Sequence, residues 1–170
     1  MGNRNHILTG AAHLAVDGVN LGFLDEGIKM TFSRDYFDVE VEQVKGVIRS
    51  DMISESLEIS TTLSETDFEK LRIAWDQEGS TLLGGSFLNI GTEGGGLEHT
   101  LQIVTLAPAS AGQTYRNITI YKAVQMDSGD QTFQRKESTK IPVKFKCLKD
   151  VLNNNKFGNM QLSNSAVVAF

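Results

Sequence analysis

The chain has 170 residues, of which 40% are apolar and 22% are charged, and its formal net charge is −5. This composition suits one folded domain with a real core and excludes a largely disordered chain. No apolar run approaches the length that spans a bilayer, so no membrane partner is expected. One cysteine excludes an internal disulfide framework. We therefore expect a single domain over residues 1–170, with an N-terminal arm at 1–12 and a C-terminal tail at 153–170.

The first elements read as antiparallel strands. Val16-Asp17-Gly18-Val19 is a strong hairpin-turn signal, because glycine tolerates a positive φ. Gly27–Phe32 alternates between apolar and polar residues, as a strand does. A second strand is predicted over Phe37–Val44, with an apolar face (Phe37, Val39, Val41) and an acidic face (Asp38, Glu40, Glu42). We expect the acidic face to be solvated, since unpaired buried carboxylates are costly.

A polar loop or hairpin tip is predicted over Lys45–Ser56, followed by an alternating strand over Leu57–Leu63. The next segment, Thr66-Asp67-Phe68-Glu69, matches a capping box with Thr66 as the N-cap. Phe68, Leu71 and Trp75 follow at spacings that share one helical face, which predicts one helix that Gly79 stops. Trp75 is expected to hold this helix on the sheet. Residues 82–96 read as a glycine-rich mobile loop or as a short strand with a flexible tip, and residues 98–106 as a further strand.

The most informative stretch is Thr114–Asp150, which reads as one long antiparallel hairpin. Its first arm places Ile118, Ile120, Val124 and Met126 on one face, and its return arm alternates through Ile141, Val143, Phe145 and Cys147. Because an isolated hairpin is marginal in water, we expect other copies of the chain to cover these arms. The predicted fold class is mainly β: two packed antiparallel sheets or a partly open barrel, with one flanking helix.

Charge is distributed unevenly along the chain. Residues 17–79 carry fifteen acidic and six basic side chains, whereas residues 116–149 carry eight basic and three acidic ones. The two segments either pair inside one fold or form two unlike faces that stack on each other, since complementary charge orients association. A basic nucleic-acid binder of the usual kind is disfavoured, because the whole chain is acidic.

No motif favours an enzyme. Asp127-Ser128-Gly129 matches the triplet of aspartic proteases, but the same residues are typical of an ordinary hairpin turn. His6, His13 and His99 share no spacing of metal ligands. Cys147 lies on an apolar strand face, so it is predicted to be a small buried hydrophobe. We expect no catalytic residue, no cofactor and no metal site.

Two parts of the sequence resemble the bacteriophage tail tube (major tail) protein family. One is Tyr115–Val124 with the returning segment Lys140–Asp150, and the other is the turn Val16–Gly22 with the strand that starts at Gly27. The resemblance implies six-fold rings of a β-sandwich or barrel with a side helix, stacked into a hollow tube through which DNA leaves the capsid. Closure of strands from six subunits into one inner barrel would remove the unpaired edges of long strands.

The resemblance also implies partners and a location. The partners are further copies of the chain, together with tail sheath, baseplate or initiator, and tail terminator proteins. The subunits assemble in the host cytoplasm into the virion tail, and DNA passes through without specific binding. Carboxylates repel phosphate, so the acidic face (Asp38, Glu40, Glu42) is the candidate lumen lining, unless it meets outside solvent or a sheath. The predicted loop supplies the candidate inter-ring residues Lys45, Arg49, Asp51 and Glu55.

Two alternatives stay open. A contractile toxin-delivery particle or a type VI secretion system has a tube subunit of the same fold. A small β-sandwich binding module, for example a carbohydrate binder, belongs to a different class. It predicts exposed aromatic residues clustered on one face, whereas Trp75 lies in the predicted helix and Tyr115 and Tyr121 lie in the predicted hairpin.

Overall fold

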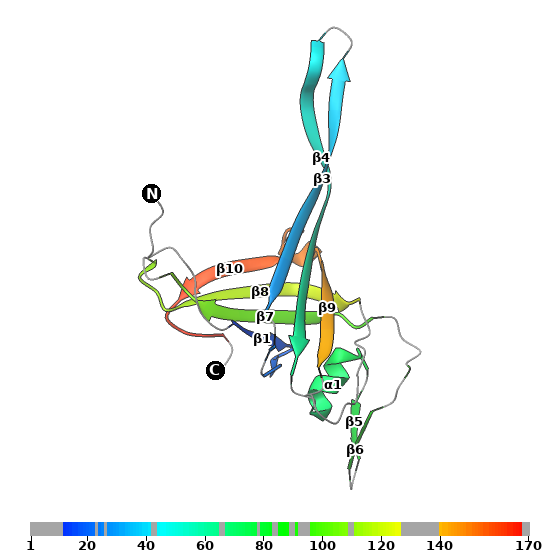
Figure 1. Ribbon diagram of the computed structural model, residues 1–170, viewed down its shortest axis with the longest axis vertical. Helices are drawn as coiled ribbons and strands as arrows, with labels where there is room; N and C mark the ends of the chain where they lie inside the picture. The colour runs from blue at the N-terminus through cyan, green and yellow to red at the C-terminus, as the bar shows by residue number, and fades with distance from the viewer. Residues whose placement is uncertain are drawn as a thin grey trace.

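The computed structural model describes residues 12–22, 24–25, 27–41, 44–64, 67–77, 79–82, 85–88, 91, 96–108, 111–126 and 140–167. Figure 1 shows the arrangement of their strands and helix. In chain order the elements are β1 (Ala12–Val16), β2 (Val19–Asn20), β3 (Lys29–Val41), β4 (Val44–Leu63), α1 (Phe68–Ala74), β5 (Gly79–Leu82), β6 (Gly85–Leu88), β7 (His99–Leu106), β8 (Tyr115–Gln125), β9 (Ile141–Leu148), a 3₁₀ turn (Val151–Asn153) and β10 (Gly158–Ser163).

Eight strands form one antiparallel sheet in the order β2-β1-β7-β8-β9-β4-β3, with β10 pairing with β8 beside this path. Strands β5 and β6 form a separate two-stranded sheet. Among the described residues the large sheet does not close on itself. The mainly β class with one flanking helix is confirmed, and the single unclosed sheet is nearer to a partly open barrel than to two packed sheets.

The first hairpin is confirmed. Asp17 and Gly18 connect β1 to β2, and both have a positive φ, of 50° and 83°. Positive φ at both central residues is the geometry of the tight turn that matches the twist of paired strands. Val16 consequently lies opposite Val19 in the register.

The prediction of one long hairpin over Thr114–Asp150 is wrong in its pairing. Strands β8 and β9 pair only between Lys122–Gln125 and Phe145–Leu148. The first half of β8 pairs with β10 instead, and β9 pairs along its whole length with β4. The chain therefore covers these arms itself, so covering them does not require other copies.

The two arms also differ in how well their alternation was predicted. Along β9 the predicted inward residues, from Ile141 to Cys147, are all buried, which confirms that face. Along β8 a register shift opposite His99 and Leu101 breaks the alternation. Ala123 therefore enters the core, whereas Val124 is only half-buried and Met126 is exposed. The predicted face with Ile118, Ile120, Val124 and Met126 is wrong beyond this shift.

The predicted loop over Lys45–Ser56 is also wrong, because all of these residues lie in β4. The two predicted strands before it are one strand, β3. The polar residues that read as a loop pair across the two strands instead. Ser54 donates a hydrogen bond to Asp35 at 2.7 Å, and the hydroxyls of Ser33 and Ser56 are 3.0 Å apart. Cross-strand pairs of this kind stabilise a sheet whose faces are in water.

The core lies between the sheet and α1. Its largest fully buried side chains include Phe145, Leu14, Leu21, Ile59, Leu63, Leu101, Ile103 and Ile141. The helix contributes Ile73 and Ala74, and the half-buried Trp75 packs against this cluster, as an anchor would. The N-cap is Asp67 rather than Thr66: its carboxylate accepts a hydrogen bond from the Lys70 backbone N–H at 2.9 Å. The helix ends at Ala74 and not next to Gly79, which starts β5.

The two oppositely charged segments pair inside the subunit. The Lys140, Lys144 and Lys149 ammonium groups lie 2.5, 2.9 and 2.8 Å from carboxylate oxygens of Asp25, Glu58 and Glu55. The interpretation that these segments pair within one fold is therefore confirmed for these side chains. Each pair is partly exposed, so it adds little to the stability of the fold. Its main effect is to neutralise, within the subunit, charges that could otherwise orient the stacking of one subunit on another.

Cys147 is 3% exposed and packs in the core, and this burial raises the pKa of its thiol to about 12. We therefore expect the folded chain to resist iodoacetamide at pH 8, while the urea-unfolded chain reacts, as measured by mass spectrometry.

The folded state holds the Cys147 thiol proton to a higher pH than the unfolded state. Its contribution to stability is complete below the ordinary pKa of 9.0 and is lost as the pH rises towards about 12. A Cys147→Ala control should lack this part of the alkaline decline, and rapid alkylation of the folded chain would contradict the assignment.

Candidate assembly surfaces

The most prominent surface feature is a hairpin that projects away from the sheet (Figure 1). Strand β4 pairs with β9 only over Leu57–Leu63, so among the described strands its earlier residues pair with β3 alone. We call this projecting part, residues 33–41 and 44–56, the β3–β4 hairpin. Its two outer edges present backbone N–H and C=O groups that no described strand pairs, which is a template for adding another strand.

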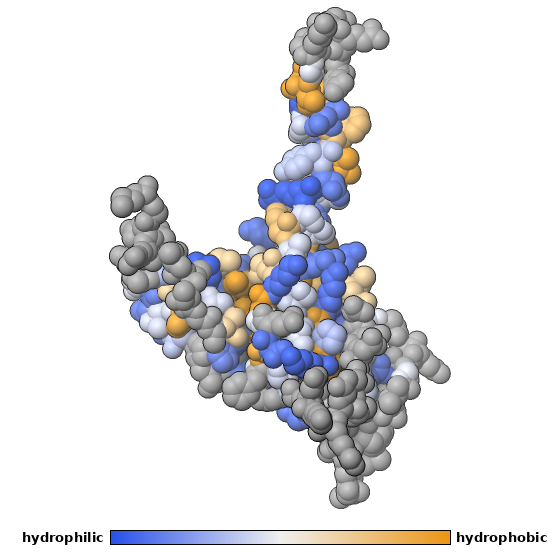
Figure 2. Space-filling model, viewed as in Figure 1, coloured by the Kyte–Doolittle hydropathy of each residue, from blue (hydrophilic) through white to orange (hydrophobic). Residues whose placement is uncertain are grey.

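The β3–β4 hairpin carries large apolar side chains in water. Figure 2 shows apolar residues along it, interspersed with polar ones. The exposed residues are Tyr36, Phe37, Val47, Ile48, Met52 and Ile53, with exposed fractions from 49% to 67%. Scattered apolar residues on a surface are ordinary, but six on one two-stranded projection form a candidate interaction surface.

A groove lies at the base of this hairpin, between β10 and the strands β3 and β4. Its volume is about 310 Å³, and its apolar lining comes from Met30, Phe32, Leu57, Ile118, Ile120, Phe157 and Met160. The Phe32 and Phe157 rings meet edge to face with centroids 6.4 Å apart. The Arg34 guanidinium lies 4.7 Å from the Phe32 centroid, and the Lys149 ammonium lies 5.6 Å from the Phe157 centroid. The groove therefore combines an apolar floor with charged groups at its edge, where the Glu55 carboxylate pairs with both Arg34 and Lys149.

Comparison with known proteins bears on these surfaces. The sequence matches no protein family and no curated protein. Among solved structures, the chain is similar to one in the sheath–tube complex of an extracellular contractile injection system, PVC, in its extended state. The identity is 10% and the TM-score is 0.55, over 89% of this chain and 88% of that chain.

The chain shares its fold with that injection-system chain. This confirms the tail-tube-like fold predicted from the sequence. The chain is also similar, at 11% identity, to chains in the tail of an empty GTA particle and in the virion of the native gene transfer agent (GTA). Both matches cover 96% of this chain and 99% of the other, with TM-scores of 0.46 and 0.42, and similarity at those scores adds nothing to the assignment.

In this tail-tube-like fold, the candidate lumen residues lie near the end of the β3–β4 hairpin. Asp38 is exposed, lies opposite Ser50 and accepts a hydrogen bond from its hydroxyl. Glu40 lies opposite Val47, with register shifts on both of its sides. Glu42 lies outside the described residues. These shifts interrupt the alternation on which a single acidic face depends, so the lumen assignment stays a prediction.

The candidate inter-ring residues all lie in β4, not in a loop. Lys45 is close to the end of the hairpin. Arg49 and Asp51 form an ion pair with 2.5 Å between Nη2 and Oδ2. Glu55 lies at the base, where the hydrogen bond from Lys149, with a further one from Arg34, holds the pKa of its carboxyl below the ordinary value.

Sequence reasoning missed the apolar part of both surfaces. The pairs Val47-Ile48 and Met52-Ile53 interrupt a polar segment, and they were the available signal for the hairpin surface. The groove had no local signal, since four segments that are distant in the sequence form it: β3, β4, β8 and residues 155–160. Within the described ranges, no cluster of three His, Cys, Asp or Glu residues could hold a metal ion. No helix in that part of the chain has the length and apolarity to cross a membrane.

Proposed function

We propose that the chain is a structural subunit of a tail tube, which polymerises as stacked hexameric rings into a conduit for DNA ejection. The observation that carries this proposal is the β3–β4 hairpin, a two-stranded projection with exposed apolar side chains and unpaired edges. The tail-tube-like fold supports it. On this proposal the subunits assemble in the host cytoplasm into the virion tail, with sheath, baseplate or initiator, and terminator proteins as further partners.

The shape of the subunit supports head-to-tail assembly. In Figure 1 the β3–β4 hairpin and the β5–β6 pair project at opposite ends of the long axis. The two ends differ, so a contact between them is heterologous, and repeated heterologous contacts generate rings or open stacks. In such a tube the carboxylates of Asp38, Glu40 and Glu42 would line the bore and repel the phosphates of passing DNA.

A tube subunit of a contractile injection machine is the second candidate. It is favoured by the fold shared with a chain in the sheath–tube complex of a contractile injection system. The two candidates require the same assembly surfaces and differ in what travels through the tube. Particles purified with this chain would contain a capsid and DNA on the first proposal and neither on the second.

The assembly test is electron microscopy of the purified full-length chain over a range of concentrations, alone and with its initiator complex. We expect six-fold rings or hollow tubes, because the exposed apolar hairpin residues gain from burial. Analytical ultracentrifugation provides the matching mass distribution. A stable monomer at every concentration, still monomeric with the initiator present, would contradict the proposal.

A further inference from the structure

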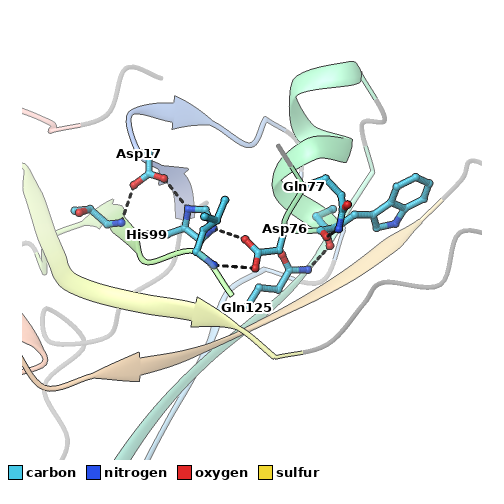
Figure 3. Close-up of polar contacts among 9 residues, drawn as sticks. Asp17, Asp76, Gln77, His99 and Gln125 are labelled. Atoms are coloured by element: carbon cyan, nitrogen blue, oxygen red, sulfur yellow. Dashed lines mark hydrogen bonds and ion pairs between the residues drawn. The ribbon is translucent and has the colours of Figure 1, made fainter. Parts of the chain in front are cut away.

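A buried histidine lies between two carboxylates at the end of the sheet opposite to the β3–β4 hairpin. His99, at the start of β7, is 8% exposed. Its Nδ1 lies 2.6 Å from Asp17 Oδ2, and its Nε2 lies 2.9 Å from Asp76 Oδ1. Figure 3 shows the imidazole held between the two side chains, with Asp17 coming from the β1–β2 turn and Asp76 from the residues after α1.

Donor counting constrains the protonation of this cluster. An ionised carboxylate only accepts hydrogen bonds, and a neutral imidazole has a single N–H donor. With a neutral ring and two carboxylates, one of the two contacts would place a nitrogen lone pair against an oxygen lone pair. The imidazolium has two N–H donors and satisfies both contacts, and the two negative charges offset the cost of burying its positive charge.

Charged groups of both signs line the cavity beside the ring. Arg72 from α1 and Glu98 before β7 line the same cavity of about 230 Å³. Glu98 is paired with the Lys122 ammonium at 2.8 Å. From β9, the Phe145 ring meets the imidazole edge to face at 6.4 Å, and from β8 the residue opposite His99 in the register is Ala123.

The backbone fixes both carboxylates in place. The second oxygen of Asp17 accepts the Thr100 N–H at 2.7 Å. The second oxygen of Asp76 accepts the Leu97 N–H at 3.1 Å. Asp76 precedes β5 and β6, and Leu97 and His99 follow them, so these contacts join the two ends of the segment that carries the β5–β6 pair. That pair is a sheet of its own, outside the large sheet.

We propose that His99 is doubly protonated and that the Asp17–His99–Asp76 cluster is a clamp that fixes the base of the β5–β6 segment to the body of the subunit. His99 acts as a positioning residue: its two N–H groups tie the β1–β2 turn to the end of α1. A side chain that cannot bridge both carboxylates removes at least one of the two bonds, which loosens the base of the segment. The inference does not depend on tube formation.

The first test is the protonation state in the wild-type chain. Long-range ¹H–¹⁵N NMR of the full-length protein, labelled at histidine and assigned with a His99→Gln variant, should show both ring nitrogens of His99 carrying a proton at neutral pH. In Asp76→Asn, one carboxylate charge is gone and the ring should change to a neutral tautomer. A neutral ring in the wild-type chain would overturn the proposal even if every variant were unstable.

The second test is hydrogen exchange of the β5–β6 segment, followed by mass spectrometry. His99→Gln and Asp76→Asn should increase exchange in residues 79–88 by about tenfold, the effect expected for one hydrogen bond to a charged group, and leave β4 and β9 unchanged. Glu98→Gln removes a neighbouring carboxylate that does not contact the ring, so it should exchange like wild type. Unchanged exchange of residues 79–88 in both variants would overturn the clamp.

Discussion

Replacing Phe37 and Ile53 with serine is expected to abolish ring stacking and tube growth while leaving a folded subunit. Phe37 is 59% exposed and Ile53 is 67% exposed, both on the β3–β4 hairpin. Substitutions at such exposed positions change stability by about 0.5 kcal/mol or less. Burial of each side chain against another subunit is worth about 1.5–3 kcal/mol. The loss of both would weaken each contact by about a hundredfold or more, because every 1.4 kcal/mol is a factor of ten.

The measurement is electron microscopy and sedimentation of the variant beside wild type, with circular dichroism to show that the subunit stays folded. Leu152→Ser is the matched control. It removes a similar apolar side chain that is 90% exposed, on the 3₁₀ turn outside the hairpin. Normal tubes from the hairpin variant, or an equal loss of tubes from Leu152→Ser, would show that the hairpin surface does not drive assembly.

Replacing Gly158 with alanine is expected to produce a large loss of stability and to displace β10 from the sheet. Gly158 lies opposite Ile120 in the β10–β8 register. A Cβ at this position would lie 2.9 Å from the Ile120 Cα and would collide with the Thr119 carbonyl oxygen, so backbone would have to move. Overpacking in a well-packed site lowers the free energy of unfolding by about 1–3 kcal/mol. Because the collision here is with backbone, we expect a loss at the upper end of this range.

Urea unfolding monitored by circular dichroism measures the change, and hydrogen exchange shows whether protection is lost in residues 158–163. Asn159→Ala, at the next position of β10, is the matched control, because the Asn159 side chain is exposed and its removal should have little effect. The variant should also lose one wall of the groove next to Phe157. An unfolding midpoint equal to that of wild type would show that β10 tolerates a side chain facing β8.

Local patterns predicted the parts of the fold that local chemistry decides. Asp17-Gly18 forms a turn because these residues tolerate positive φ angles. The alternation from Ile141 to Cys147 predicted a strand with one buried face, which β9 has. The single helix was found from the spacing of Phe68, Leu71 and Trp75. Its N-cap was misplaced by one residue, because two adjacent residues can both accept a hydrogen bond from the first turn.

Pairing between distant segments could not be read from the sequence. Tyr115–Gln125 has a pattern that suits a hairpin partner, but its first half pairs with β10 along one edge and Tyr115–Ala123 pairs with β7 along the other. Side-chain period alone does not say which strand lies next to which. The stretch Lys45–Ser56 read as a loop, because its serines and charges are rare in buried strands. It is a strand because it pairs with β3, and at four positions (Ser50, Ser54, Glu55 and Ser56) the partner in β3 is polar as well.

The roles predicted for the candidate lumen and inter-ring residues stay predictions. The charged residues named from the sequence, such as Asp38, Arg49 and Asp51, do lie in the projecting segment of β3 and β4. The apolar side chains between them, such as Ile53, are the larger feature of its surface. The groove and the His99 cluster each combine residues more than eighty positions apart, so no spacing along the chain could reveal them.

The unequal support along the β3–β4 hairpin has a mechanical consequence. Its base belongs to a broad sheet, but its outer part has a single hydrogen-bonded ladder with register shifts at Asp35/Tyr36 and near Glu40. Such shifts are points where a strand pair bends. Tension along the hairpin is borne by two covalent backbones, whereas bending is resisted only by that narrow ladder. A filament whose subunits are joined through such hairpins resists stretching and yields to curvature, so it can bow under sideways load without changing its length.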